Sequence, residues 1–142
     1  MNSVIMETDA NGTYVGSSLM YASARDWAIF GQLYLQDGVW NGERILPEGW
    51  VKYSSTPTTT LSPYGFYGAQ FWINTQQDPP ADSDIPPVWK GVPKDAYYAS
   101  GFEQQTVLII PSKNVVIVRL GQTLDRSAWD IGDFAAKVLK VI

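Results

Sequence analysis

Apolar residues recur at helical spacing from about Ser23 to Gln36. The residues that follow this spacing are Trp27, Phe30, Gly31 and Tyr34. A repeat every three to four positions is typical of a helix with one buried face. Ser23 is followed three places on by the acidic Asp26, a pattern close to a capping box, and Gly38 stops the repeat. We therefore expect a helix that begins at Ser23.

Two further helices are predicted. The terminal stretch "SAWDIGDFAAKVLKVI" puts its apolar residues on one helical face, which predicts a helix that packs on the rest of the fold. These apolar residues are Ile131, Phe134, Ala135, Val138 and Ile142. Earlier in the chain Asn41-Gly42 marks a turn, and we expect Pro47 at the first position of a short helix.

From Pro63 the pattern changes to strands. The segment "YGAQFWIN" predicts a strand that ends near Asn74. The segment "YYASGFEQQTVLII" predicts a second strand with Ser100-Gly101 near its head, and "VVIVRL" a third, joined to the second as an antiparallel hairpin by the turn "PSKN". Residues 75–95 hold five of the nine prolines and show no periodicity, which is typical of a functional flap or an inserted loop.

This order of elements predicts an α+β fold in a single domain, residues 1–142. Residues 1–62 form its helical part, and residues 63–142 form a three-stranded antiparallel sheet with the C-terminal helix packed on it. One helix covers only one face of such a sheet. We therefore expect the other face to need a partner, and an unpaired strand edge to invite pairing with another chain.

Composition narrows the possible chemistry. The formal net charge is -4 and the pI is near 4.6, which disfavours nucleic acid or an anionic membrane surface as a partner. No apolar run approaches the 18 residues typical of a membrane segment. The chain has no histidine and no cysteine, so a Ser-His-Asp triad, a Cys-His pair and a His or Cys zinc site are excluded. We expect neither a metal nor a cofactor.

Three stretches resemble the C-terminal part of one superfamily. They are "GSSLMYASARDWAIFGQLYLQDGVWNGERILPEGWV", "YGAQFWIN" and "YYASGFEQQTVLIIPSKNVVIVRLG". Together they are similar to the serine β-lactamase-like superfamily, which includes penicillin-binding DD-peptidases, class C β-lactamases, esterases and 6-aminohexanoate-oligomer hydrolases. The resemblance implies a partial β-lactamase/transpeptidase-like fold. It also implies an acyl-enzyme cleavage of small amide, ester or peptide substrates, and a periplasmic or extracytoplasmic location.

The nucleophile motif of that family, Ser-x-x-Lys, is absent, because no serine of this chain has a lysine three places on. The chain alone is therefore expected to be inactive, as the C-terminal fragment of a longer hydrolase. Tyr21-Ala22-Ser23 matches the family's Tyr-x-Ser pattern, but it lies in a segment that resembles the family downstream of that motif. We expect Tyr21 to be a core or helix-entry aromatic; a catalytic or supporting role is the alternative.

The family's third motif, Lys-Thr-Gly in β-lactamases, matches Ala99-Ser100-Gly101. The resemblance implies that Ser100 hydrogen-bonds substrate, that Gly101 allows close approach, and that the backbone N–H of Phe102 contributes to an oxyanion hole. Ala99 removes the family's cation, which favours ester or amide substrates over β-lactams. Gln104 stands where many relatives have glycine. The alternative reading of Ser100-Gly101 is a bulged strand edge with a polar rim.

Other polar and aromatic residues have simpler interpretations. We expect Glu103 to be a solvated charge at a strand edge, and Trp89 either to cover a pocket or to anchor its loop. Charges near the helix starts are expected to cap or pair; they are Arg25, Asp26, Asp125, Arg126 and Asp130. The rival to the hydrolase interpretation is a non-catalytic binding or self-assembly module, in which a homo-oligomer pairs through the exposed sheet edge.

Overall fold

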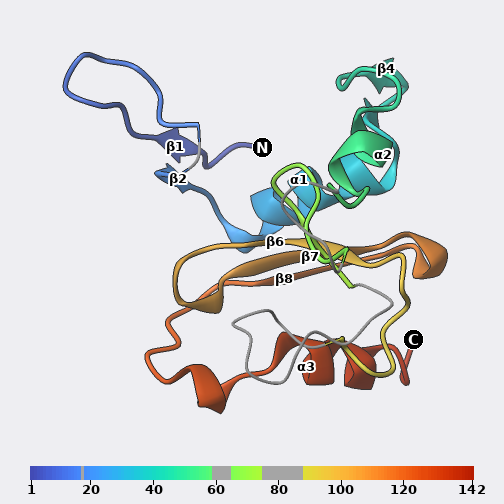
Figure 1. Ribbon diagram of the computed structural model, residues 1–142. Helices are drawn as coiled ribbons and strands as arrows, with labels where there is room; N and C mark the ends of the chain where they lie inside the picture. The colour runs from blue at the N-terminus through green and yellow to red at the C-terminus, as the bar shows by residue number, and fades with distance from the viewer. Residues whose placement is uncertain (17, 59–64, 75–87) are drawn as a thin grey trace.

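A computed structural model describes residues 1–16, 18–58, 65–74 and 88–142 of the chain. Figure 1 shows a sheet with helices on both of its sides and a two-stranded hairpin, close to the N-terminus, that stands apart from it. In chain order, with η for 3₁₀ helices, the elements are β1 (Ile5–Met6), β2 (Met20–Tyr21), α1 (Ala24–Leu35), β3 (Val39–Trp40), β4 (Glu43–Arg44), α2 (Trp50–Ser54), β5 (Trp72–Ile73), β6 (Tyr97–Ser100), η1 (Phe102–Gln104), β7 (Thr106–Ile110), η2 (Pro111–Lys113), β8 (Val115–Arg119), η3 (Arg126–Ala128) and α3 (Ile131–Val138).

The predicted first helix is confirmed as α1. Its N-cap is Ser23, whose side-chain oxygen accepts a hydrogen bond from the Asp26 amide at 3.2 Å. The predicted C-terminal helix is confirmed as α3, where Asp130 caps the first turn by accepting from the Asp133 amide at 3.0 Å. The short helix α2 begins at Trp50, so the expectation for Pro47 was wrong. Pro47 lies before the helix and accepts the Trp50 amide through its carbonyl.

The main sheet has four antiparallel strands in the order β5-β6-β7-β8, not three. The single strand predicted over residues 97–110 is two strands, β6 and β7, which pair from Tyr97↔Ile109 to Ser100↔Thr106. The chain reverses between them because Glu103 and Gln104 both adopt positive φ, 55° and 63°. Ser100-Gly101 therefore ends a strand at a hairpin turn instead of starting one.

Both faces of the sheet are covered, which corrects the expectation of an uncovered face. Every residue of β7 is buried, and its side chains alternate between two clusters. Val107 and Ile109 pack with aromatic residues of α1, while Leu108 and Ile110 pack with α3. Figure 1 shows α1 and α3 on opposite sides of β7, as this alternation requires. The core is therefore a three-layer arrangement of helix, sheet and helix.

Trp89 is a packing anchor, which decides between the two interpretations of this side chain. Its ring is 9% exposed and stacks on Tyr98 with centroids 4.4 Å apart. The buried Asn74 fixes the surrounding backbone, since its side chain accepts from the Trp89 amide at 2.9 Å and donates to the carbonyls of Val92 and Pro93. Most of the proline-rich loop expected over residues 75–95, namely 75–87, lies outside the described residues.

Candidate functional site

The sequence-predicted site residues lie together at the end of β6. Ala99 is half-buried, Ser100 and Gly101 are exposed, and the Phe102 side chain is 80% exposed. In Figure 1 this is the turn that joins β6 to β7, at the end of the sheet where β8 finishes. The four residues therefore form one continuous, solvent-accessible rim.

Beside this rim, the pairing of β6 with β5 stops before the end of β6. The register of β5 with β6 runs through Tyr97 and Tyr98 only. No strand in the described ranges pairs with Ala99 or Ser100 on that side, although β7 pairs with both on the other. An unpaired strand edge offers backbone groups to an extended ligand.

The turn has a defined backbone geometry. Gly101 donates its amide to the Gln105 carbonyl at 2.8 Å, and Gln105 donates to the Phe102 carbonyl at 3.3 Å. The Phe102 amide, by contrast, has no acceptor among the described residues, and neither does the Ser100 hydroxyl. An unpaired backbone N–H next to an unpaired hydroxyl on an exposed turn can bind the oxygen of a carbonyl or carboxylate.

Sequence reasoning missed Arg119, the last residue of β8. One of its terminal guanidinium nitrogens, Nη1, lies 3.1 Å from the Glu103 carbonyl oxygen and 3.4 Å from that of Gln104, and it also donates to Gly121 at 3.2 Å. The guanidinium carbon sits 5.1 Å from the centre of the Trp129 ring. The only signal in the sequence was a basic residue at the end of the apolar run "VVIVR".

Thr106 supports the same turn from β7. Its side chain is 3% exposed and donates to the Gln104 carbonyl at 3.0 Å. Glu103, predicted as a strand-edge charge, lies within the turn instead, with a half-buried side chain and its carbonyl bound by Arg119. Side chains of β7 and β8 therefore bind the carbonyls of Glu103 and Gln104, which follow Phe102 in the sequence.

Tyr21 is not a core residue. It lies in β2, is 52% exposed, and pairs across the hairpin with Ile5. Ser23, the other polar member of the tripeptide, serves as the N-cap of α1. The tripeptide thus enters the helix as expected, but its aromatic ring faces solvent.

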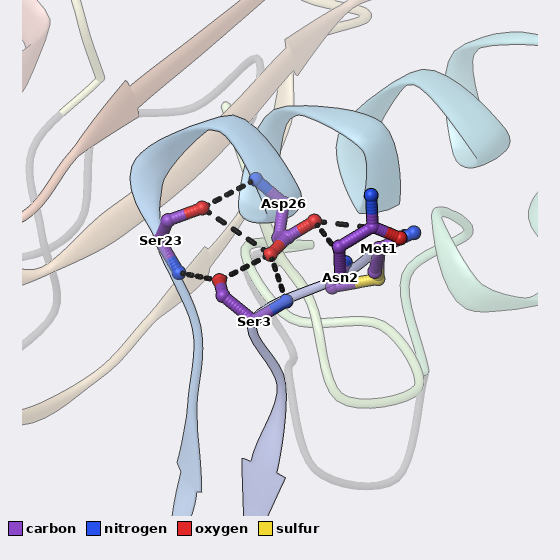
Figure 2. A network of polar contacts seen from close by, with 5 residues as sticks. All are labelled: Met1, Asn2, Ser3, Ser23 and Asp26. Atoms are coloured by element: carbon purple, nitrogen blue, oxygen red, sulfur yellow. Dashed lines mark hydrogen bonds and ion pairs between the residues drawn. The ribbon is translucent and has the colours of Figure 1, made fainter.

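Asp26 is the centre of a polar network that ties the N-terminal segment to α1 (Figure 2). It accepts from the hydroxyl of Ser3, from the amides of Asn2 and Ser3, each at 2.9 Å, and from the hydroxyl of Ser23. The Ser3 hydroxyl is the main cause that lowers the pKa of Asp26 to about 2, and the two amides and Ser23 add to it against the cost of desolvation. This confirms the expected capping and pairing role of Asp26.

The remaining candidate charges have local partners or lie at the surface. Hydrogen bonds from the Ser127 hydroxyl and amide lower the pKa of Asp125, which caps η3. Arg25 is exposed on α1, and the side chain of Arg126 lies outside what the structure describes. Across the described ranges, no group of three acidic, histidine or cysteine side chains is placed to hold a metal.

A hollow of about 490 Å³ lies between α1 and the β3–β4 hairpin. Its lining consists of Gln32, Gln36, Val39, Trp40, Asn41 and Gly42. It contains none of the residues that the sequence predicted for the site. It also lacks charged side chains and nucleophiles, so acid–base or covalent chemistry has no group there.

No helix in the described part of the chain has both the length and the apolar run needed to cross a bilayer.

Comparisons with known proteins show a similar fold in a solved structure, and they show how much of two longer proteins this chain spans. No protein-family model matches the sequence. An uncharacterized protein of Alkalihalophilus pseudofirmus is 30% identical over 103 residues, which are 70% of this chain and 29% of that protein. The solved structure of a "Putative 6-aminohexanoate-dimer hydrolase from Bacillus anthracis" superposes with a TM-score of 0.62 and 24% identity, covering 96% of this chain and 31% of that one.

The superposition on the solved structure supports the α+β fold that the sequence predicted. Almost the whole chain superposes on part of one larger structure. The main sheet has four strands where three were expected. The chain spans less than a third of the length of either protein. The fold is therefore similar to one part of a larger structure.

Proposed function

We propose that this chain is the C-terminal part of a serine hydrolase of the β-lactamase-like superfamily, forming one wall of its acyl-enzyme site. The unpaired Phe102 amide carries this proposal, because it stands on an exposed turn at the open end of β6, next to Ser100 and Gly101. A fixed backbone N–H at that point suits the oxyanion of a tetrahedral intermediate. The nucleophile would come from a Ser-x-x-Lys segment outside this sequence.

Each rim residue has a role in this proposal. The Ser100 hydroxyl binds a carbonyl or carboxylate oxygen of the substrate, and Gly101, which has no side chain, lets the substrate backbone approach. The Phe102 amide stabilises the negative charge that develops on the carbonyl oxygen. Ala99 places no cation beside them, so we propose small ester, amide or peptide substrates and weak activity on β-lactams. We further propose that residues 1–142 form one continuous portion of this domain in a periplasmic or extracytoplasmic enzyme, and that the portion alone is inactive.

The test uses the reading frame that encodes this sequence. We expect it to contain an upstream Ser-x-x-Lys, and the full-length product to be labelled by a fluorophosphonate probe at that serine, as seen by intact mass. Residues 1–142 alone should remain unlabelled. An upstream frame without the motif, or turnover of p-nitrophenyl butyrate by residues 1–142 alone, would contradict the proposal.

Phe102 allows a sharper test in the full-length product. Phe102→Pro removes the backbone donor, and loss of one oxyanion donor typically lowers kcat by about 10²–10³-fold. Phe102→Ala is the matched control, since it removes the exposed ring but keeps the amide. We expect the alanine variant to stay within a few-fold of the parent. Equal effects of both substitutions would show that the amide is not the active group.

A non-catalytic assembly module is the second candidate, and one observation favours it. The β1–β2 hairpin exposes apolar side chains on both of its faces. Exposed apolar surface of this kind marks a contact site. A reading frame without the nucleophile motif would favour this candidate over the hydrolase.

A further inference from the structure

We propose that Arg119 is a positioning residue that fixes the turn 101–105 so that the Phe102 amide points outward to a ligand oxygen. This inference rests on the proposed hydrolase function for its catalytic consequence, whereas the positioning itself is a property of this chain.

The turn contains two consecutive residues in an unfavourable conformation. Glu103 and Gln104 have φ values of 55° and 63°, in the left-handed region that side chains with a Cβ rarely adopt. Neither position is glycine or asparagine, the residues that adopt this conformation most easily. A strained backbone persists only where the surrounding structure holds it.

Arg119 contacts the backbone of both strained residues. Its Nη1 donates to the Glu103 carbonyl at 3.1 Å and lies 3.4 Å from the Gln104 carbonyl. Hydrogen bonds from a charged donor are about twice as strong as neutral ones. Thr106 adds a neutral bond to the Gln104 carbonyl. The carbonyls of the strained segment are therefore bound by two neighbouring strands.

The guanidinium of Arg119 is itself fixed by a neighbouring ring, and its charge is directed to the turn. Its guanidinium lies over the Trp129 ring at 5.1 Å, a distance suited to a cation–π contact. In the described part of the chain no carboxylate lies within ion-pair distance of it, whereas Arg44 pairs with Asp37. The positive charge therefore faces backbone carbonyls and is not neutralised by an acidic partner.

The free Phe102 amide is the consequence. The turn directs the carbonyls of Glu103 and Gln104 to Arg119, while the amide of Phe102, one residue earlier, has no acceptor among the described residues. A donor fixed before the reaction needs no reorganisation when charge develops on the substrate. Loss of Arg119 would let the turn relax and the amide would lose its fixed direction.

The first experiment uses residues 1–142 and does not depend on catalysis. Hydrogen exchange followed by NMR reports on the Gly101 and Gln105 amides, whose bonds close the turn. We expect Arg119→Met to accelerate exchange of both amides at least tenfold, while the amides of β7 and α1 stay protected. Arg119→Lys should give an intermediate rate, because one compact ammonium cannot reproduce the guanidinium's contacts.

Arg44→Met is the matched control. Arg44 also binds two backbone carbonyls, those of Asp37 and Leu46, but it lies in the β3–β4 hairpin. It should leave the exchange at Gly101 and Gln105 unchanged. If Arg119→Met unfolds the chain, the comparison rests on Arg119→Lys. Unchanged exchange in a folded Arg119 variant would overturn the proposal.

The second experiment separates this inference from the proposed function. In the full-length hydrolase, Arg119→Met should lower kcat by about tenfold or more with little change in KM, and Arg119→Lys should restore part of it. Faster exchange in a protein without hydrolase activity would refute the proposed function and leave the positioning role intact. An active hydrolase with unchanged kcat in Arg119→Met would refute the catalytic consequence of that role.

Discussion

At the scale of single residues, the Asp26 carboxylate has a structural role. Asp26 accepts hydrogen bonds from Asn2, Ser3 and Ser23, and it joins residues that are more than twenty positions apart. Each of these donors favours the carboxylate over the neutral acid. The segment before β1 is therefore anchored to α1 by the ionised form of one side chain.

Asp26→Asn should lower the thermal midpoint at pH 7 by several degrees and free the amides of Asn2 and Ser3. The pKa of Asp26 is lowered from 3.8 to about 2, so its contribution to stability is complete above pH 4 and is lost as the pH falls toward 2. The difference between parent and variant should shrink over that range in thermal melts followed by circular dichroism. The control is Asp9→Asn, in an exposed turn outside the network. A difference that stays constant from pH 5 to pH 2.5 would contradict the assignment.

Glu103 tests the strain in the turn directly. Its φ of 55° destabilises the folded state by roughly 1–2 kcal/mol, because the residue has a Cβ. Glycine avoids this strain but loses about 0.5–1 kcal/mol more in conformational entropy on folding. Glu103→Gly should therefore raise the free energy of unfolding by about 0.5–1 kcal/mol in urea titrations. Glu103→Ala removes the same carboxylate but keeps the Cβ, so it should bring no gain. A similar gain from alanine would mean that the carboxylate, not the backbone, carried the cost.

At the scale of elements, α1 and α3 each have a glycine where the helix packs against the core. A Cβ on Gly31 of α1 would lie 2.6 Å from a Val116 methyl carbon, and one on Gly132 of α3 would lie 2.3 Å from the Trp89 ring. Neither glycine has positive φ, so each is required by space and not by backbone conformation. The missing side chains let each helix lie close to the residues that it covers.

Gly132→Ala should destabilise the protein although alanine is the better helix former. Insertion of a methyl group into a packed core costs about 1–3 kcal/mol, which exceeds the gain of about 1 kcal/mol in helix propensity. We expect a lower urea midpoint and a changed Trp89 fluorescence. Gly16→Ala is the control, because nothing lies within 4 Å of a Cβ there. A stabilised Gly132→Ala variant would show that Trp89 moves aside freely.

The same elements show what the sequence could predict. Helices α1 and α3 were predictable because their caps and apolar repeats are local signals. The β6–β7 hairpin was not, since Glu103 and Gln104 adopt a conformation that turns usually assign to glycine or asparagine. Arg119 was not predictable either: it reaches the turn through the pairing of Thr106 with Arg119, a register that no local pattern specifies.

At the scale of the whole molecule, both faces of the sheet are covered, whereas the β1–β2 hairpin exposes apolar side chains. The expected partner for a bare sheet face is not needed, because α1 fills that place. The hairpin, however, stands apart in Figure 1, and its two cross-strand pairs, Ile5↔Tyr21 and Met6↔Met20, point to opposite faces. Ile5, Met6 and Tyr21 are 65%, 40% and 52% exposed. A two-stranded hairpin is marginally stable by itself, so this one gains most from a covering surface.

We expect residues 1–142 alone to self-associate, because a second copy of the chain can cover the exposed hairpin. We expect a concentration-dependent dimer or larger species by size-exclusion chromatography with light scattering, and we expect Ile5→Ser with Tyr21→Ser to shift it to monomer. Leu124→Ser with Ile142→Ser is the control pair, since these residues are even more exposed, at 86% and 73%, but lie outside the hairpin. A monomer at every concentration would contradict the prediction. An equal loss of assembly in both double variants would move the contact away from the hairpin. Association that survives both pairs would instead favour the open strand edges, where backbone groups of β6 or β8 could pair between chains without these side chains.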